Sequence, residues 1–264
     1  MTDPHISVVT ICFNNLAELK LTCQHLDAQL QLPYEHWIID GSKNDEIKNW
    51  IRNSPQPSYR HSIHEPDRGI SDAFNKGVQH SKGDIIHIHN SGDYYYNECV
   101  LRHVTAAFKE NIGAKWLHGK YAQYRGGIWL VSGNSYERTK LYRGMRTIGH
   151  PTMFVYKDLY TKYGLFLEDK KIAMDYDFLV RIANEPFVFL NEPLVYFTPG
   201  GVSEQRIEPG LKEVAESYRK HIGISIKQQL WHTRIKLLHS IMKSPPGNII
   251  VQIKNRNRKI NIPD

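Results

Sequence analysis

The fold of this chain is most restricted by four strand patterns that alternate with helix patterns over its first 95 residues. The strand patterns are short runs of strand-forming residues, found at Ile6–Ile11, His36–Ile39, Tyr59–His64 and Ile85–His89. The helix patterns have apolar residues at helical spacing, and they cover Leu16–Leu30, Asp45–Asn53 and Ile70–Ser81. Such alternation over short connections is typical of a mostly parallel sheet flanked by helices. We therefore predict an α/β fold.

Polar clusters follow the predicted strands directly. They lie at Thr10–Asn14, Asp40–Ser42, Glu65–Asp72 and Asn90–Asp93. In open parallel sheets, ligands bind beyond the carboxyl ends of the strands. The sequence therefore predicts a ligand site at this edge of the sheet.

The second half of the chain is less regular. We predict a β-hairpin over Trp116–Tyr124 and Gly127–Val131 with its turn at 125–127. Further strands are expected at His150–Val155, Phe187–Leu190 and Val195–Phe197, and helices at Asp175–Asn184, Pro209–His221 and Ser225–Lys243. These patterns indicate one domain over residues 1–205, with halves 1–95 and 96–205, and a helical basic extension over 206–264.

The net charge of +7 is confined to the C-terminal segment. Ile222–Asp264 contains eight basic residues and one acid, so this segment carries all of the excess. Such asymmetry is weak evidence for nucleic acid, which we do not expect as a partner, and it fits an anionic membrane surface.

The last predicted helix is amphipathic. One apolar face holds Ile226, Leu230, Leu237 and Ile241, and it is broadened by Trp231, Ile235, Leu238 and Met242. Lys227, Arg234, Lys236 and Lys243 lie mainly off that face, and a basic run follows at Lys254–Lys259. A basic amphipathic helix with a Trp can lie in the headgroup region of a membrane. The alternative is that its apolar face packs on the rest of the protein.

Targeting features are absent from the sequence patterns. No apolar run approaches the ~18–20 residues that span a bilayer, and the first residues do not resemble a signal peptide. The three cysteines, Cys12, Cys23 and Cys99, are odd in number and contain no C-x-x-C pair. We expect a cytoplasmic protein, with possible peripheral contact at the inner face of the plasma membrane.

The segment with the clearest chemical pattern is Glu65–Gly77, E-P-D-R-G-I-S-D-A-F-N-K-G. Arg68 and Gly69 come directly before a predicted helix N-terminus, where backbone N–H groups and a cation favour an anion such as a diphosphate. The alternative is a capped surface helix with an ordinary Asp72–Lys76 ion pair.

This segment resembles the D-x-G-x-x-D-A-x-N-x-G signature of family 2 glycosyltransferases, which have the Rossmann-like GT-A fold. Five more segments resemble family motifs in the same order: Val8–Asn15, Trp37–Ser42, His89–Asp93, Ala173–Arg181 and Pro199–Ser203. The resemblance covers residues 5–205. It implies a nucleotide-sugar site made of Thr10, Phe13, Asn14, Asp40, Arg68, Gly69, Asp72, Asn75, Ser91 and Gly92.

The resemblance also implies a divalent cation, Mn²⁺ or Mg²⁺. Many relatives carry three acids in the metal-binding region, whereas this chain has Asn90, Gly92 and Asp93. Because a hard cation keeps diphosphate oxygens and water among its ligands, one carboxylate can suffice. We therefore assign the metal to Asp93, with Asn90 as a further oxygen contact.

Asp175 aligns with the catalytic base of the family. Asp177 is the nearby alternative, but it can also cap a helix and pair with Arg181 four residues later. His150 matches a histidine that relatives often have near the acceptor, so we place His150 and Asp177 on the acceptor side. A base at the acceptor hydroxyl and a cation at the leaving diphosphate would give direct, inverting displacement.

Together these features predict a metal-dependent inverting glycosyltransferase of the hexosyltransferase type. Its donor would be a nucleoside diphosphate sugar, most readily a UDP-sugar, and its acceptor a glycan or lipid-linked hydroxyl in surface polysaccharide assembly. One alternative is a sugar-nucleotide pyrophosphorylase, which would want a G-x-G-T-R loop where this chain has Cys12–Asn15. The other is a non-catalytic nucleotide-sugar-binding module.

Overall fold

The computed structural model describes residues 3–125, 128–146, 148–198, 201 and 205–243. Several predicted features fall partly or wholly outside this part of the chain: the 125–127 turn, the start of the Gly127–Val131 strand, the Pro199–Ser203 loop and the end of the 206–264 extension, with its Lys254–Lys259 run. The side chains of Met242 and Lys243 also lie outside the described part. No helix in the described ranges is long and apolar enough to cross a membrane.

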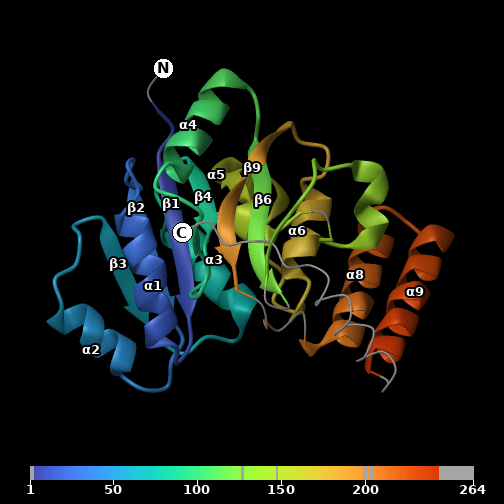
Figure 1. The fold of residues 1–264 in the computed structure, drawn as a ribbon, viewed down its shortest axis with the longest axis horizontal. Helices are drawn as coiled ribbons and strands as arrows, with labels where there is room; N and C mark the ends of the chain where they lie inside the picture. The colour runs from blue at the N-terminus through green and yellow to red at the C-terminus, as the bar shows by residue number, and fades with distance from the viewer. Residues whose placement is uncertain (1–2, 126–127, 147, 199–200, 202–204, 244–264) are drawn as a thin grey trace.

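The strands of the described residues form one mixed sheet (Figure 1). Their order is β3-β2-β1-β4-β8-β6-β9-β5, and β7 pairs with β6. The strands span Ile6–Cys12 (β1), Glu35–Asp40 (β2), Arg60–His64 (β3), Ile85–Ile88 (β4), Tyr94–Tyr95 (β5), Trp116–Arg125 (β6), Ile128–Ser132 (β7), Phe154–Tyr156 (β8) and Phe187–Phe197 (β9). Strands β1 to β4 pair in parallel, as predicted, whereas β8 is antiparallel to both of its neighbours.

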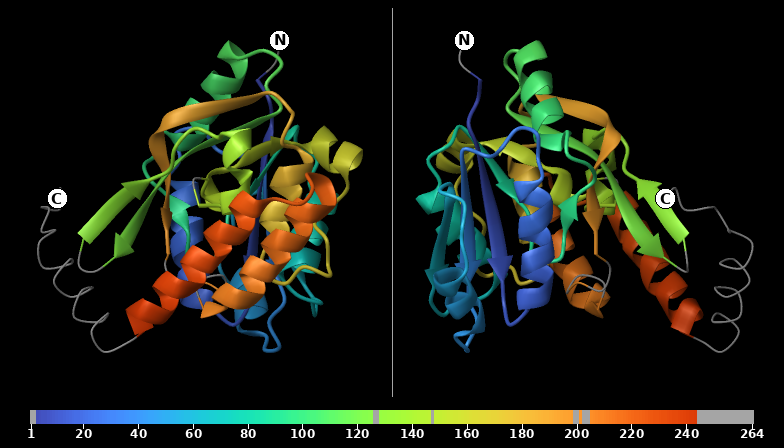
Figure 2. Two further views of the ribbon diagram at one scale, coloured as in Figure 1. Left: turned by 90° about the vertical axis from the view of Figure 1, so that its right-hand side faces the viewer. Right: turned by 60° about the vertical axis from the view of Figure 1, so that its left-hand side comes forward.

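Helices cover both faces of the sheet. They span Leu16–Asp27 (α1), Glu46–Asn53 (α2), Ile70–His80 (α3), Val100–Glu110 (α4), Lys157–Tyr163 (α5), Met174–Arg181 (α6), Ile207–His221 (α8) and Ile226–Lys243 (α9), with 3₁₀ turns at Arg138–Arg143 (η1) and His150–Thr152 (η2). Helices α8 and α9 lie beside each other, on the opposite side of the molecule from α2 and β3 (Figures 1 and 2). The α/β fold class and the helical C-terminal part are confirmed, and the boundary at residue 205 stays a prediction.

Several elements differ from the sequence-based prediction. Helices α4 and α5 and strand β5 were not predicted. The strand expected at His150–Val155 begins as the 3₁₀ turn η2, because Pro151 fixes its own φ and lacks an N–H for the ladder. The two short strands expected between residues 187 and 197 are one strand, β9, which follows β6 through an irregular register near Gly119.

The core explains why β1 is apolar at successive positions. Ile6 and Val8 belong to the cluster beneath α4, whereas Val9 belongs to the cluster beneath α3, α5 and α6. Alternate side chains of a strand point to opposite faces, so a strand covered on both faces needs apolar residues at neighbouring positions, such as Val8 and Val9. The position of β1 inside the sheet therefore follows from its sequence.

Helix α3 packs very closely on β1 at Gly77. A Cβ atom added there would lie 2.1 Å from Cγ1 of Val9, whose side chain is fully buried. Because α3 begins beside the carboxyl ends of the strands, this contact fixes the height of the helix N-terminus at the predicted ligand edge. Gly77 is therefore a packing residue of the candidate site.

We expect Gly77→Ala to lower the free energy of unfolding by about 1–3 kcal/mol, because overpacking at Val9 outweighs the better helix propensity of alanine. Denaturant unfolding measures this change. The matched control is Gly201→Ala, where an added Cβ meets nothing within 4 Å. An equal effect of the two substitutions would contradict the close-packing argument.

Candidate active site

The loops after the parallel strands meet at one edge, as predicted. The backbone N–H of Ser91 donates to the carbonyl of Ile11 at 3.2 Å, and that of Gly41 donates to Cys12 at 3.1 Å. Side chains add to this frame, since Ser42 Oγ accepts from the N–H of Asn14 at 2.7 Å. Asn14 has a φ of 53°, a left-handed conformation that asparagine tolerates better than most residues. The first-strand loop is thus held against both neighbouring loops.

Asp40 and Thr10 are buried and already hydrogen-bonded. One carboxylate oxygen of Asp40 accepts from the N–H of Ser42 at 2.9 Å, and the other accepts from Nδ1 of His64 at 2.7 Å. The hydroxyl of Thr10 lies 2.9 Å from Nε2 of His36. Both side chains are therefore already bonded to protein partners, whereas Phe13 and Asn14 are exposed.

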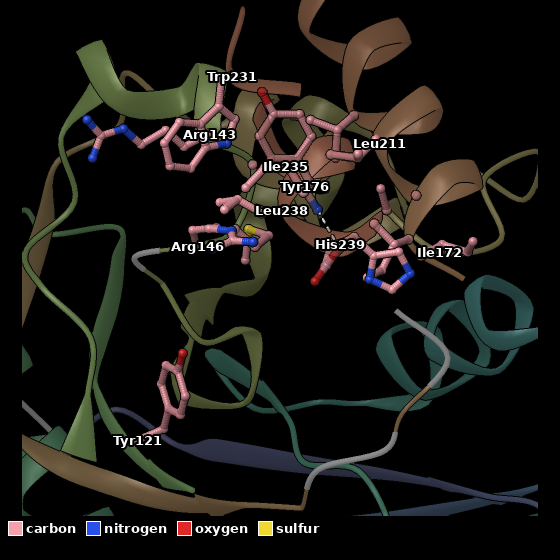
Figure 3. A pocket seen from close by; sticks show the side chains of 17 residues that line it. Tyr121, Arg143, Arg146, Ile172, Tyr176, Leu211, Trp231, Ile235, Leu238 and His239 are labelled. Atoms are coloured by element: carbon pink, nitrogen blue, oxygen red, sulfur yellow. Dashed lines mark hydrogen bonds between the residues drawn. The ribbon is translucent and has the colours of Figure 1, made fainter. Parts of the chain in front are cut away.

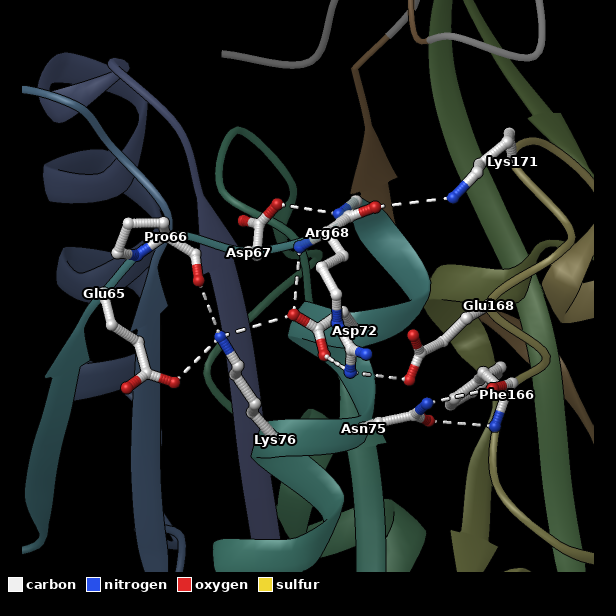
Figure 4. Close-up of polar contacts among 11 residues, drawn as sticks. Glu65, Pro66, Asp67, Arg68, Asp72, Asn75, Lys76, Phe166, Glu168 and Lys171 are labelled. Atoms are coloured by element: carbon white, nitrogen blue, oxygen red, sulfur yellow. Dashed lines mark hydrogen bonds and ion pairs between the residues drawn. The ribbon is translucent and has the colours of Figure 1, made fainter.

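The Glu65–Gly77 segment forms an ion-pair network at the start of α3 (Figure 4). The guanidinium of Arg68 contacts carboxylate oxygens of Asp72 at 2.8 Å and Glu168 at 3.0 Å. Asp72 also accepts from the backbone N–H of Arg68 and pairs with Lys76 at 3.3 Å. The hydrogen bond from the Arg68 guanidinium lowers the pKa of Asp72 to about 2.

This loop has features of both structures that its sequence suggested, an anion site and a surface helix with an ion pair. The Asp72–Lys76 ion pair is present, although Asp72 is buried and no side chain caps α3 at Gly69; the cation and glycine expected of an anion site are there too. The backbone N–H of Gly69 is taken by Asp67 at 3.0 Å. Gly69 has a φ of 124°, a backbone conformation that residues with a side chain rarely adopt. A diphosphate that binds to Arg68 and to the N–H of Gly69 would therefore have to replace the protein carboxylates that now contact these groups.

Two further residues of this region have clear positions. Asn75 forms paired hydrogen bonds, each 2.9 Å long, with the backbone N–H and carbonyl of Phe166, so its amide links α3 to the segment before α6. Lys171, which sequence reasoning missed, donates to the carbonyl of Arg68 at 3.4 Å. Its proximity comes from the tertiary fold, because 103 residues separate the two.

Asp93 lies in a closed turn after β4. Thr198 donates its backbone N–H to Oδ1 of Asp93 at 3.0 Å, and the hydroxyl of Thr22 bridges the carbonyl of Asp93 and the N–H of Gly92. Only 3% of Asp93 is exposed, and burial raises the pKa of its carboxyl to about 7. Among the described residues no cationic side chain pairs with Asp93, so the ionised form of this buried carboxyl is costly unless a cation binds.

The residues present fit a hard divalent ion. Among the described residues, Oδ1 of Asn90 is buried and has no hydrogen-bond partner, and Asn90 comes three positions before Asp93 in the chain. An amide oxygen and a carboxylate are ligands that Mg²⁺ and Mn²⁺ accept. Within the described ranges no three His, Cys, Asp or Glu side chains are grouped to hold a metal. The protein would therefore supply part of the coordination and leave positions for diphosphate oxygens and water.

The second part of the candidate site lies around Asp175. It lies in the first turn of α6, and Oδ1 accepts from the backbone N–H of Tyr176 at 2.7 Å. Burial raises the pKa of Asp175, and the charge of nearby His150 opposes that rise. The pKa of His150 is lowered by burial, and its ring stacks on Phe74 with centroids 5.4 Å apart. The structure therefore brings these two sequence-predicted residues together.

Asp177 has different surroundings, although it is only two residues away. It is fully buried, and its carboxylate accepts from Nε of Arg181 at 2.9 Å and from Nε2 of His221 at 3.2 Å. Arg181 in turn donates to the carbonyls of Gly164 and Leu165. These contacts connect α6 to α8 and to the loop that precedes α6. Asp177 therefore has a structural role.

Asp175 faces a pocket of about 660 Å³ between β6, α6, α8 and α9 (Figure 3). Most of its lining is apolar, with cationic side chains and Asp175 as the one acid among the lining residues. The lining consists of Tyr121, Arg143, Gly144, Met145, Arg146, Ile172, Ala173, Asp175, Tyr176, Ile207, Gly210, Leu211, Val214, Trp231, Ile235, Leu238 and His239. Sequence reasoning missed nearly all of them; the one available signal was the broadened apolar face of the last predicted helix.

The two apolar sides of helix α9 differ in their exposure. Ile235 is buried and, with Trp231 and Leu238, lines the pocket. The face predicted as primary is exposed instead, with exposed fractions of 73% for Ile226 and 66% for Leu230. The packing alternative is therefore right for one side of the helix and wrong for the other.

Comparison with known proteins connects this geometry to a family. The chain is 29% identical over 227 residues to an uncharacterized glycosyltransferase of Mycobacterium tuberculosis, covering 83% of this chain and 86% of the relative. It is 25% identical over 190 residues to a PGL/p-HBAD biosynthesis glycosyltransferase of Mycobacterium bovis, covering 70% and 72%.

Solved structures show the same fold. The mannosyltransferase PcManGT from Pyrobaculum calidifontis, in complex with GDP-Man and Mn²⁺, aligns with a TM-score of 0.62 and 15% identity over 99% of this chain and 77% of its own. S. aureus TarS 1–349 in complex with UDP-GlcNAc aligns with a TM-score of 0.59 and 14% identity, over 96% and 77%. The family model for glycosyl transferase family 2 matches residues 7–160, more than half of the sequence. The chain therefore belongs to glycosyl transferase family 2.

Proposed function

We propose that the protein transfers a hexose from a nucleoside diphosphate donor to a hydroxyl of a glycan or lipid-linked acceptor, with inversion and with help from a divalent cation. The observation that carries this proposal is that each part of the site holds a carboxylate: Asp93 is buried at the strand edge, and Asp175 lines the pocket. Family membership favours this activity over a pyrophosphorylase, and the two carboxylates favour it over a non-catalytic module.

The donor would lie across the loops after β1, β2 and β4 and the start of α3. Asp40 and Asn14 would border the nucleoside, and Arg68 and Gly69 the diphosphate. Solved relatives in complex with UDP-GlcNAc and with GDP-Man support a nucleotide-sugar donor. A UDP-sugar is our choice between these, by resemblance to the family.

Asp93, with the unpartnered Oδ1 of Asn90, would hold Mn²⁺ or Mg²⁺. Such an ion neutralises charge on the leaving diphosphate. The backbone N–H of Thr198 orients the Asp93 carboxylate, because it fixes one of its two oxygens.

Asp175 would accept the proton of the acceptor hydroxyl. Burial raises its pKa, and a more basic carboxylate is a better proton acceptor as long as it stays ionised. His150 lies near Asp175, and a proton on its ring would favour the ionised form of this carboxyl. Asp177 would act only through the fold, as the anchor between α6 and α8.

The exposed side of α9 supports contact with a membrane. Ile226, Leu230, Leu237 and Ile241 are exposed, and the described basic side chains of this helix, Lys227, Arg234 and Lys236, are exposed as well. We place the protein at the cytoplasmic face of an anionic membrane, in surface glycan assembly. The relative from Mycobacterium bovis, described as a PGL/p-HBAD biosynthesis enzyme, supports the assembly role.

Asp93→Asn should abolish transfer and remove the Mn²⁺-dependent part of nucleotide affinity, because the amide keeps the acceptor for Thr198 but loses the charge. Calorimetric titration of UDP and GDP at increasing Mn²⁺ measures this effect. Asp158→Asn, a change at an exposed acid on α5, is the control. Superimposable Mn²⁺ curves for wild type and Asp93→Asn would refute the metal assignment.

Asp175→Asn should keep donor affinity and lower kcat by about 10²–10⁴-fold, the range for loss of a general base. Asp177→Asn should lower the free energy of unfolding by about 3 kcal/mol, because Arg181 loses its buried partner, and it should cost less activity. Steady-state kinetics and denaturant unfolding of both variants separate the roles. If the two variants exchange behaviour, Asp177 is the base.

Membrane contact should require anionic lipid, because α9 combines apolar and basic side chains, and it should weaken as salt shortens the Debye length. Vesicle co-sedimentation with phosphatidylglycerol or phosphatidylcholine tests this expectation. The double change Leu230→Asn and Leu237→Asn should abolish sedimentation, whereas Leu32→Asn and Ile112→Asn, also at exposed sites, should not. Equal sedimentation with neutral vesicles would contradict the proposal.

A further inference from the structure

Helix α6 begins without a capping side chain of its own. Its N-cap residue is Ala173, whose methyl group accepts no hydrogen bond. The first backbone N–H groups of a helix have no partner inside it, and residues such as Ser, Thr, Asp or Asn commonly accept from them. Because Asp175 lies in the first turn of α6, whatever holds this end of the helix also sets the position of its carboxyl.

A carboxylate on α8 holds this end. One oxygen of Glu213, Oε1, accepts from the backbone N–H of Lys171 at 3.0 Å. The other, Oε2, accepts from the N–H groups of Ile172 at 2.9 Å and Ala173 at 2.8 Å. Such charge-assisted hydrogen bonds are stronger than neutral ones, and an anion at a helix N-terminus also interacts favourably with the helix dipole. Glu213 therefore fixes the backbone just before Asp175, although 40 residues separate it from Ala173.

The segment held in this way also reaches the start of α3. Nζ of Lys171 donates to the carbonyl of Arg68 at 3.4 Å (Figure 4), and the hydroxyl of Ser71 donates to the carbonyl of Lys170 at 3.1 Å. The residues just before α6 therefore contact the proposed diphosphate site at α3 and lead directly into the helix that carries Asp175.

The charge of Glu213 acts on Asp175 as well. Burial is the largest cause of the raised pKa of Asp175, and the negative charge of Glu213 raises it further. Two neighbouring carboxyls disfavour each other's ionisation, because like charges repel. Other titratable groups near Asp175 are His150 from η2, whose charge opposes the rise, and, from the pocket lining, Tyr121, Arg143, Arg146, Tyr176 and His239. Glu213 is thus linked to Asp175 both through the backbone and through its charge.

We propose that Glu213 is a positioning residue for transfer: it fixes the backbone from which Asp175 faces the pocket. Its charge would in addition make the Asp175 carboxyl a stronger proton acceptor. This inference rests on the proposed role of Asp175 as the base. It makes α8, which the sequence placed in a C-terminal extension, part of the site.

The test follows the Asp175 carboxyl directly in the whole protein, without donor or acceptor. NMR of isotope-labelled aspartate carboxyl carbons gives its titration, and the resonance missing from Asp175→Asn assigns it. Glu213→Gln should lower the pKa of Asp175, because glutamine keeps the length of the side chain but removes the charge. The amide groups of residues 171–173 should exchange hydrogen about tenfold faster, because glutamine has only one acceptor oxygen for them.

Two further variants separate charge from reach. Glu216→Gln removes the same charge three residues later on α8, where an exposed carboxylate pairs with the side chain of Lys170 at 2.7 Å, so amide exchange at 171–173 should not change. Glu213→Asp keeps the charge but is one methylene shorter, so exchange should quicken while the pKa of Asp175 stays raised. Turnover, measured as nucleotide release from the donor that the wild type uses, should fall about tenfold in Glu213→Gln.

Each contrary result has a definite meaning. An unchanged Asp175 titration in a folded Glu213→Gln, or an equal response to Glu216→Gln, would overturn the proposal. If Glu213→Gln does not fold, Glu213→Asp decides, and wild-type exchange rates at 171–173 in that variant would overturn it. Full turnover by Asp175→Asn would refute the proposed base, whereas a shifted Asp175 titration in Glu213→Gln would still show that α8 acts on this carboxyl.

Discussion

The site depends on the parallel pairing of β1 with β2 on one side and β4 on the other. In that register Cys12 lies opposite Asp40, and Val9 lies opposite Ile88, so three strand ends open at the same edge. Parallel strands end on one side because each must return through a crossover helix. The close contact of α3 with β1 at Gly77 then brings a helix N-terminus to the same edge. A nucleotide site is possible here because the backbone has already gathered its loops.

The other half of the site depends on a buried ion pair. Asp177 connects α6 to α8 through His221 and, through Arg181, to the loop before α6, and this places the first turn of α6, with Asp175, beside α8. Buried ion pairs add little net stability, but removal of one partner is costly because it leaves a buried charge unpaired. Asp177 therefore holds α6 in place, whereas Asp175 remains available to the pocket.

The sequence predicted the first half well because its signals are local. Apolar runs and helical spacing identify β1 to β4 and α1 to α3, and Asp93 and Asp175 stand out by their place in family motifs. Helices α4 and α5 were overlooked, and the region of η2 was misassigned because His150–Val155 combines a 3₁₀ turn with a short strand. The proximity of His150 and Asp175 was implied only by resemblance, because strand and helix patterns carry no distances.

The sequence by itself determined the fold class, the edge of the sheet where a donor would bind and the amphipathic nature of α9, since periodicity and turn chemistry are properties of neighbouring residues. Only the tertiary structure decided which side of α9 is covered. Trp231 and Ile235 face the pocket because η1 packs there, and the stripe through Leu230 faces outward. It also decided that Arg143, Arg146 and Arg234 surround one ring. These contacts join residues far apart in the chain, and their energies depend on packing that no local pattern encodes.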